Sequence, residues 1–423
     1  MARIPVARSA CTQQTSFPEF MYLTHLSLTN YRYFSRIDAA ISPGVTLLVG
    51  DNAQGKTSLL EAVYFLATFS AFATSDTRQV VNFLAAKEPL AVARIVADYI
   101  RAGRTHHLEV RLIQEQGDFP AAPRRLRREA LLDGAPYKVS ALLGRFNAVL
   151  FLPQMLQIID GAPELRRRYL DMTLSQIVPA YPEALTQYRK ALSQRNALLK
   201  LLQERNNGAS QLAYWDEQVS EWGAKIMHAR IQAIHELGLL AASTHRDLSR
   251  GTEILRLAYR PAMEPLPQAS GQYALPLDTP IERTHLSLEE IRTRFAAQLE
   301  SRRTGDIQSG ATTIGPHRDD LDFLANGVSL GHYGSRGQLR TAMMSLKLAE
   351  VSWMHTKTGE WPVLLLDEML AELDPTRRTD LLERLSHSEQ VFATTTDLDL
   401  FTAEFIETAR IWRIHAGQLE IPA

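Results

Sequence analysis

The chain contains a single cysteine, Cys11, among its 423 residues. One thiol cannot form an internal disulfide and provides no cysteine-based zinc site, which favours a reducing, cytoplasmic setting over secretion. The sequence also lacks any stretch close to the ~20 uninterrupted apolar residues that a membrane-spanning helix requires. Residues 1–20 show neither the apolar core nor the cleavage pattern of a signal peptide. We therefore expect no membrane partner, and we treat residues 1–20 as a loose N-terminal extension.

An excess of charge of one sign is absent as well, because 46 Lys and Arg residues stand against 47 Asp and Glu residues. A nucleic-acid-binding protein with this balance has to gather its basic residues on one face. Net charge therefore neither predicts nor excludes a nucleic-acid partner. The length of 423 residues exceeds what a single hydrophobic core usually serves, so we expect two lobes.

Hydrophobic patterning predicts how these lobes follow one another along the chain. Residues 21–140 are rich in strand patterns, and further buried strands are predicted within 306–423, at 363–366 and 390–394. The intervening residues 141–305 are mainly helical, and apolar residues spaced by three and four predict an αα-hairpin there. We expect one α/β lobe that is split in sequence, with a helical lobe inserted between its halves.

Residues 50–57 match the P-loop pattern G-x-x-x-x-G-K-[ST], between a predicted strand and a predicted helix. In such a loop the backbone N–H groups and the helix N-terminus bind phosphate oxygens. Lys56 would neutralise the β and γ phosphates, and Thr57 would offer its hydroxyl to Mg²⁺. The motif predicts binding of ATP and Mg²⁺ through Gly50, Asp51, Asn52, Ala53, Gln54, Gly55, Lys56, Thr57 and Ser58.

A second candidate site is the Asp367-Glu368 pair at the end of the apolar run 363–366. Asp367 is a candidate Mg²⁺ ligand, and Glu368 is a candidate catalytic residue that orients or deprotonates the attacking water. Two carboxylates after a strand also occur in ordinary strand-to-loop turns. The P-loop favours the catalytic interpretation.

The segment 333–338 provides a third phosphate-binding candidate, with Ser335, Gly337 and Gln338 before a long predicted helix. It resembles the S-x-G-Q core of the ABC signature, which binds the γ-phosphate of an ATP held by another subunit. By itself a Gly-Ser turn before a helix is also an ordinary N-cap. The order of P-loop, helical insertion, S-x-G-Q, Asp-Glu and residues 371–374 predicts an α/β, P-loop ABC-type ATPase head, a mixed sheet with flanking helices and an inserted α-helical lobe. We expect an ATP-dependent homodimer whose catalytic residues are Lys56, Ser335 and Glu368.

Beyond these motifs, the chain resembles the RecF family of bacterial recombination mediators, which is related to the heads of SMC proteins. The resemblance runs from Met21 nearly to the end and is most specific at 26–34, 160–171, 194–196 and 315–320. It implies an ATP-gated DNA clamp that binds single-strand/duplex junctions in gap repair and replication restart. It also implies RecR-type and RecO-type mediators and the strand-exchange protein RecA as partners.

The resemblance carries further roles over to single residues. Asp374 would line the dimer interface, Arg32 or Tyr33 would contact adenine, and Gln154 would sense the metal and water, although the family more often has an acid there. ABC heads usually carry a switch histidine after the strand that follows Asp-Glu, whereas this chain has threonines at 394–396, as RecF-like proteins do. A hydroxyl cannot act as a cation towards the γ-phosphate, so we expect slow hydrolysis.

Candidate DNA contacts are clusters of basic residues, whose contacts with phosphates would be independent of sequence and sensitive to salt. Such clusters also occur simply as solvated faces. No pattern of a helix-turn-helix, zinc finger or aromatic stacking platform is present, so reading of bases is not predicted. The clusters are Arg124 to Arg128, Arg166 to Arg168, Arg302 with Arg303, and Arg336.

Two other functions share parts of this pattern. The ATPase subunit of a membrane transporter has the same order of motifs, but the helical insertion, residues 315–320 and the missing switch histidine argue against it. An SMC-like head that drives a nuclease or a long coiled coil is disfavoured, because an arm of hundreds of residues and a cysteine hook are both missing from the sequence.

Overall fold

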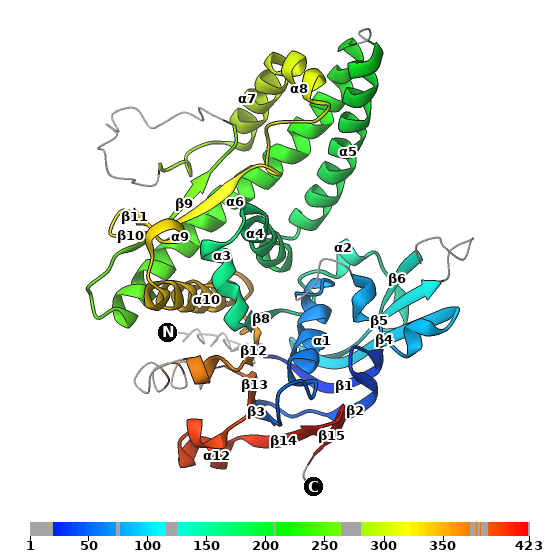
Figure 1. The fold of residues 1–423 in the computed structure, drawn as a ribbon, viewed down its shortest axis with the longest axis vertical. Coiled ribbons are helices and arrows are strands. Elements are labelled where there is room, and N and C mark those ends of the chain that lie inside the picture. The colour runs from blue at the N-terminus through cyan, green and yellow to red at the C-terminus, as the bar shows by residue number, and fades with distance from the viewer. Residues whose placement is uncertain are drawn as a thin grey trace, which may run out of the picture.

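The computed structural model describes residues 20–72, 77–115, 125–205, 209–263, 281–372, 378, 381 and 388–421. These residues form an α/β lobe and a helical lobe, from which a helical arm projects (Figure 1). Within the described ranges, no helix combines the length and the apolar character needed to span a bilayer.

An antiparallel sheet with the order β2-β1-β4-β5-β6-β7 forms one side of the α/β lobe. The β4–β5 hairpin closes through a tight turn, in which Ala102 and Gly103 have φ values of 47° and 71°. Two consecutive residues with positive φ give a turn whose twist matches that of paired strands, and glycine takes this conformation without strain. The strands are β1 (Met21–Tyr31), β2 (Phe34–Ala40), β4 (Leu90–Arg101), β5 (Arg104–Glu115), β6 (Arg125–Leu132) and β7 (Ala135–Pro136).

A second sheet has the order β15-β14-β3-β13-β12-β8 and is parallel except for β15. The order places β13 between β3, which precedes the P-loop, and β12, which ends in Asp367. The carboxyl ends of all three therefore lie at one edge of the sheet. The strands are β3 (Gly44–Val49), β8 (Ala148–Phe151), β12 (Val363–Asp367), β13 (Gln390–Thr395), β14 (Arg410–His415) and β15 (Gln418–Glu420).

Helices cover both faces of this parallel sheet. Helix α1 (Lys56–Thr68) packs on one face, where Leu365 belongs to the same apolar core, and also contacts β4 of the antiparallel sheet. Helix α10 (Arg336–Thr358) packs on the other face with Leu364 and Leu366. Successive strand residues point to opposite faces, so a strand buried on both sides is continuously apolar. This explains why 363–366 lacks polar alternation.

The helical lobe contains the predicted αα-hairpin, formed by α5 (Tyr181–Arg205) and α6 (Leu212–Leu248), which run side by side in the arm (Figure 1). Helix α7 (Leu288–Ser301) packs on α6 and begins with a capping box, in which Ser287 and Glu290 exchange both hydrogen bonds. A small sheet, β11-β10-β9, completes the lobe with β9 (Leu255–Arg260), β10 (Asp320–Ala325) and β11 (Val328–Ser329).

The remaining helices among the described residues connect these elements, and all but one of them are short. They are η1 (Thr77–Val80), η2 (Ala85–Lys87), α2 (Val139–Leu142), η3 (Pro153–Leu156), α3 (Gln157–Asp160), α4 (Pro163–Ile177), η4 (Ala209–Gln211), α8 (Arg303–Ser309), α9 (Leu330–Tyr333), η5 (Met369–Glu372), η6 (Leu398–Leu400) and α12 (Ala403–Thr408). Of these, α4 is the longest and contacts α1, α5, α6 and α10, so it joins the two lobes.

The structure moves two of the predicted lobe boundaries. Strand β8 lies in the range 141–305 that was assigned to the helical lobe, yet it pairs with β12 in the parallel sheet. Strand β10 lies in the range 306–423, yet it pairs with β9 of the helical lobe. Strand partners are set by contacts between distant segments, which a short apolar run does not encode. Residues 1–19 of the predicted extension lie outside the described residues.

Buried ionic contacts tie the helical lobe together at the sequence stretches that carry the family resemblance. Arg195 on α5 is fully buried and donates to Asp216 on α6, Asp306 on α8 and the Thr312 hydroxyl, each at 2.7 Å. The Asn196 carboxamide oxygen accepts from the backbone N–H of Thr312 at 2.8 Å. The stretch 194–196 therefore holds the chain that leads into 315–320.

Removing the guanidinium of Arg195 would leave two buried carboxylates without their shared partner. Loss of one side of a buried ion pair costs about 3–5 kcal/mol. We expect Arg195→Met to lower the free energy of unfolding by about this amount, measured by urea denaturation followed by circular dichroism. Arg292→Met is the matched control, because Arg292 pairs with Glu289 on the solvent side of α7 and should unfold like the wild type. Equal stability of the two variants would contradict this assignment.

Candidate functional site

The P-loop follows β3 and leads into α1. Ala53 and Gly55 have left-handed backbone, with φ values of 62° and 111°, and such residues turn successive N–H groups into one concave face. A Cβ atom at Gly55 would lie 2.9 Å from the Phe34 ring, and one at Gly50 would lie 2.4 Å from the carbonyl oxygen of Ile414. Packing therefore requires a glycine at both positions, and at Gly55 the backbone conformation requires it as well.

Lys56, the first residue of α1, is 4 % exposed. Its ammonium group donates to the carbonyl oxygens of Gly50 at 2.6 Å and Asp51 at 3.1 Å. It also pairs with a carboxylate oxygen of Glu368 at 3.2 Å. The cation is thus held over the P-loop beside the predicted catalytic carboxylate.

Thr57 and Asp367 meet across 310 residues of sequence. The Thr57 hydroxyl lies 2.9 Å from both carboxylate oxygens of Asp367. Burial raises the pKa of Asp367, while hydrogen bonds from Thr394 and Thr57 act in the opposite direction. The structure therefore brings together the hydroxyl and the carboxylate that were predicted as magnesium ligands.

Thr394, at the end of β13, positions both acidic residues. Its hydroxyl donates to Asp367 at 2.8 Å and accepts from the backbone N–H of Glu368 at 2.9 Å. Glu368 has a φ of 50°, a left-handed conformation that is costly for a residue with a side chain. From the sequence, the threonines at 394–396 mattered only because they stand where ABC heads have a histidine. The contacts by which Thr394 positions the two acidic residues were not predicted.

These residues fit a nucleotide with a magnesium ion. The loop has a glycine-shaped concave face, a buried lysine lies over it, and a hydroxyl and a carboxylate lie side by side at its edge. No cluster of three or more His, Cys, Asp or Glu side chains suited to a metal occurs among the residues that the structure describes. The candidate magnesium site accordingly depends on Thr57, Asp367 and oxygens of the nucleotide itself.

The signature segment forms the N-terminus of α10. Ser335 accepts from the backbone N–H of Gln338 at 3.3 Å, and Gln338 accepts from that of Ser335 at 2.9 Å. The N-cap interpretation is therefore correct for the chain alone. Ser335 and Gly337 are nevertheless exposed, and the start of α10 lies beside α9, well away from α1 (Figure 1). Within one chain, this segment and the P-loop do not form a common site.

Arg32 and Tyr33, the two predicted adenine contacts, differ in whether their side chains are already engaged. The guanidinium of Arg32 donates to both carboxylate oxygens of Glu61 at 2.8 and 2.9 Å and to the carbonyl oxygen of Gln79 at 3.0 Å. Tyr33 is 66 % exposed. Of the two, Tyr33 has the surface that stacking on a base requires.

Two other predicted residues remain predictions. Gln154 lies exposed in η3, just after β8, at the same sheet edge as Asp367. No hydrogen bond of its side chain is found among the described residues. Asp374, expected at the dimer interface, lies outside the described part of the chain.

The predicted basic clusters divide into structural and exposed arginines. Arg166 on α4 is 9 % exposed and pairs with Asp320 at 2.6 and 2.9 Å, so as a predicted DNA contact it is wrong. Arg303 is tied to Asp216 at 2.6 Å. Arg127 alternates with Arg128 along β6, and its side chain is 62 % exposed. Arg302 and Arg336 are exposed as well, while Arg124 lies outside the described ranges.

Comparisons with known proteins agree with this geometry. The model of the RecF/RecN/SMC N-terminal domain family matches residues 22–415. A protein of Chloroflexus aggregans named DNA replication and repair protein RecF is 40 % identical over 407 residues, covering 94 % of this chain and 99 % of the relative. Relatives with the same name from Roseiflexus castenholzii and Lacticaseibacillus paracasei are 39 % and 34 % identical, each over 94 % of this chain and 99 % of their own length.

A solved structure described as the recombination mediator protein RecF with ATP in the RecFOR pathway matches with a TM-score of 0.81 and 28 % identity. The match covers 97 % of this chain and all of the solved one. This confirms the predicted fold class, an ABC-type ATPase head with an inserted helical lobe. On the family model and the near-full-length relatives together, the chain belongs to the RecF family.

Proposed function

We propose that this chain is an ATP-dependent DNA clamp that closes as a homodimer and acts as a recombination mediator in gap repair and replication restart. The observation that carries the proposal is the separation of the exposed Ser335 segment from the P-loop of the same chain. The N-terminus of α10 at Ser335 can contribute to catalysis only when a phosphate lies against it. In a face-to-face dimer, each Ser335 segment would meet the nucleotide held by the partner.

Each side chain of the site has a distinct role in the proposed reaction. Lys56 would compensate the charge of the β and γ phosphates, and Thr57 with Asp367 would hold a magnesium ion, which would supply charge stabilisation at the transferring phosphoryl group. Glu368 orients and deprotonates the attacking water. Because the Lys56–Glu368 contact of 3.2 Å has to open when phosphates enter, nucleotide binding releases Glu368 for this task.

Hydrolysis in the proposed clamp is slow and serves to reopen the dimer. Thr394 holds the two acids, and no histidine occurs between 390 and 400 to place a cation at the γ-phosphate. DNA binding would stimulate hydrolysis by stabilising the closed dimer.

The proposed DNA partner is a single-strand/duplex junction, and RecR-type and RecO-type mediators with RecA act in the same pathway. Solved relatives described as recombination mediators in the RecFOR pathway support this assignment. The transporter alternative has no support from the family comparison, and the proposal includes no membrane partner.

Lys56→Ala removes the buried counter-charge of the triphosphate. Charge-assisted hydrogen bonds contribute about 1.5–3 kcal/mol, so we expect ATP affinity to fall at least about tenfold. Isothermal titration calorimetry with ATP and Mg²⁺ measures this loss. Lys200→Ala, on an exposed position of α5, is the control and should bind like the wild type. Undiminished affinity of Lys56→Ala would show that the loop is not the phosphate site.

Glu368→Gln should keep nucleotide binding while removing the base, so that an ATP-bound dimer accumulates. We expect light scattering to give twice the 47.5 kDa mass of the chain with ATP and Mg²⁺, and a gap-containing DNA to co-elute with the dimer. Adding Ser335→Arg places a bulky cation at the shared interface and should return the protein to a monomer that releases DNA. A Glu368→Gln variant that stays monomeric under these conditions would overturn the shared-site proposal.

Thr394→Val tests the positioning role of this threonine. The substitution keeps the shape but removes the hydrogen bonds to Asp367 and to the N–H of Glu368, so hydrolysis should fall by about 10–100-fold, measured as phosphate release. Thr394→Ser should restore most of the rate, because it restores the hydroxyl. ATP affinity without Mg²⁺ should stay within about twofold of the wild type, and a rate unaffected by the valine would exclude the role.

A further inference from the structure

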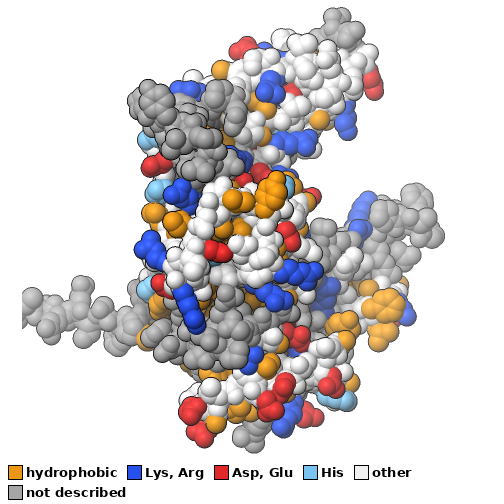
Figure 2. Space-filling model, turned by 60° about the vertical axis from the view of Figure 1, so that its left-hand side comes forward, with side chains coloured by type: hydrophobic (Ala, Val, Ile, Leu, Met, Phe, Trp, Pro, Cys, Tyr) orange, Lys and Arg blue, Asp and Glu red, His pale blue; other side chains and the backbone are white. Residues whose placement is uncertain are grey.

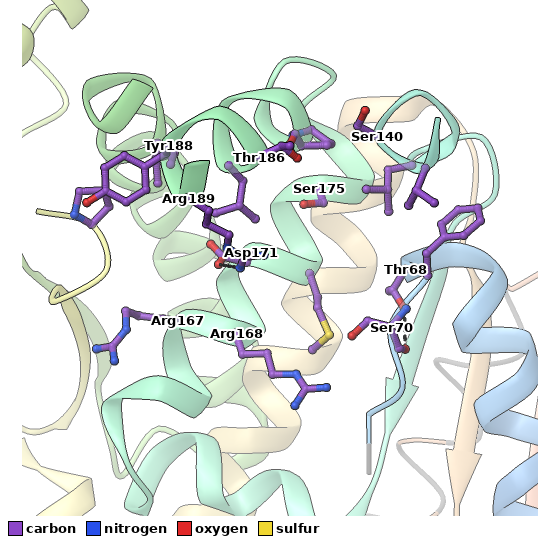
Figure 3. A pocket seen from close by; sticks show the side chains of 18 of the residues that line it. Thr68, Ser70, Ser140, Arg167, Arg168, Asp171, Ser175, Thr186, Tyr188 and Arg189 are labelled. Carbon is purple, nitrogen blue, oxygen red and sulfur yellow. Dashed lines mark hydrogen bonds and ion pairs between the residues drawn. The ribbon is translucent and has the colours of Figure 1, made fainter. Parts of the chain in front are cut away.

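A cavity of about 870 Å³ lies between the two lobes, outside the nucleotide site. Its walls come from the end of α1, from β6 and α2 on the α/β side, and from α4, α5 and residues 316–317 on the helical side (Figure 3). Lys and Arg side chains are frequent along the concave side between the arm and the body of the molecule (Figure 2). The cavity is large enough for a small ligand or a short strand.

Positive charge dominates the wall of this cavity. Six lining side chains among the described residues are cationic, and two, Glu164 and Asp171, are acidic. Asp171 is already engaged, because it accepts hydrogen bonds from Arg230 at 2.8 Å, from Arg189 at 3.2 Å and from the Tyr181 hydroxyl at 2.6 Å. The cations are Arg128, Lys138, Arg167, Arg168, Arg189 and Arg230.

Among the described residues, Arg128 makes no hydrogen bond or ion pair with an acidic side chain. Its side chain points from β6 to the carbonyl oxygen of Phe69 at 2.7 Å and the Thr77 hydroxyl at 3.4 Å, both uncharged. Its buried Nε has no hydrogen-bond partner among the residues that the structure describes. Burial lowers the pKa of this guanidinium. Burying a cation is costly unless it is paired, so a ligand anion would stabilise it.

The other groups in the wall suit a phosphodiester rather than a carboxylate-bearing protein segment. Hydroxyls of Ser70, Ser140, Ser175 and Thr186 also line the cavity (Figure 3), and contacts to the DNA backbone use such a mixture of hydroxyl and basic groups. His317 adds no charge at neutral pH, because burial lowers its pKa to about 4.

We propose that this inter-lobe cavity binds the backbone of a short segment of single-stranded DNA, while duplex DNA is held elsewhere on the dimer. The proposal rests on the DNA-clamp function proposed above and specifies which strand is bound and where. The cavity is closed on several sides by α1, α4 and α5, so an extruded strand fits where a duplex does not. It thereby gives a physical basis for selecting single-strand/duplex junctions.

Binding of the strand would also affect the ATP site, through helix α1. Arg128 donates to the carbonyl oxygen of Phe69, and Arg168 on α4 donates to that of Ala71, so both hold the chain just beyond the C-terminal end of α1. The N-terminal end of the same helix carries Lys56. Phosphates that compete for these arginines change the support of α1, and binding linkage requires that ATP then changes strand affinity by the same factor.

The test uses two fluorescein-labelled probes, a six-nucleotide dT strand and a blunt 20-base-pair duplex, with full-length protein, ATP and Mg²⁺. Lys138→Glu and Arg189→Glu alter cavity residues on exposed positions, so folding should be kept, as melting curves will verify. We expect each to weaken dT binding at least about tenfold and to leave duplex affinity and DNA-free ATPase activity within about twofold. Arg292→Glu, on α7 and outside the cavity lining, is the charge-matched control and should bind both probes like the wild type.

The outcomes separate this proposal from the clamp function. Wild-type affinity for dT in both cavity variants, with duplex binding intact, would overturn the cavity assignment alone. Failure of the wild type to bind either probe would instead overturn the clamp function. Inorganic pyrophosphate should displace dT if phosphates are the recognised groups, whereas displacement by a polyglutamate peptide at equal charge concentration would show an acidic protein site and reject the DNA assignment.

Discussion

The helix that follows the P-loop is confined on all sides, and the rest of the structure depends on this. Every residue of α1 except Thr57 is buried, and the helix contacts β4 of the antiparallel sheet as well as β8, β12 and β13 of the parallel one. A helix packed this way cannot shift at one end without disturbing the other, because protein interiors are close-packed. The phosphate site at Lys56 and the arginines at Phe69 and Ala71 are therefore the two ends of one rigid element.

The order of the strands in the parallel sheet fixes the positions of the acidic residues, just as close packing fixes the position of α1. The strand order β3-β13-β12 places Thr57 beside Asp367. Thr394, on the strand between them, contacts both Asp367 and Glu368. The hydrogen bond to the Glu368 amide helps to maintain a backbone conformation that is costly in isolation. Where ABC heads usually have a histidine that can carry charge, this chain therefore has a threonine that positions Asp367 and Glu368.

Motifs whose chemistry is local could be predicted from the sequence, and contacts between distant segments could not. Gly55 and Lys56 follow from the spacing of the P-loop, and Ser335 from its place before a helix. Arg166 looked identical to its neighbours in a run of three arginines, and only the fold shows that Asp320 neutralises it. The inter-lobe cavity was missed for the same reason, since Arg128 and Lys138 come from different elements than Arg189.

A path of buried contacts connects the shared face of the proposed dimer to the cavity. Helix α10 starts at Ser335 and carries Lys347 and Glu350, a fully buried ion pair. Glu350 also accepts from the Tyr169 hydroxyl at 3.1 Å and from the Thr173 hydroxyl at 2.9 Å, both on α4. Arg168, which directly precedes Tyr169 on α4, contacts the chain beyond α1. In the proposed dimer, a nucleotide that contacts Ser335 from the partner would therefore act on α4, and through it on both the arginines of the cavity and the end of the P-loop helix.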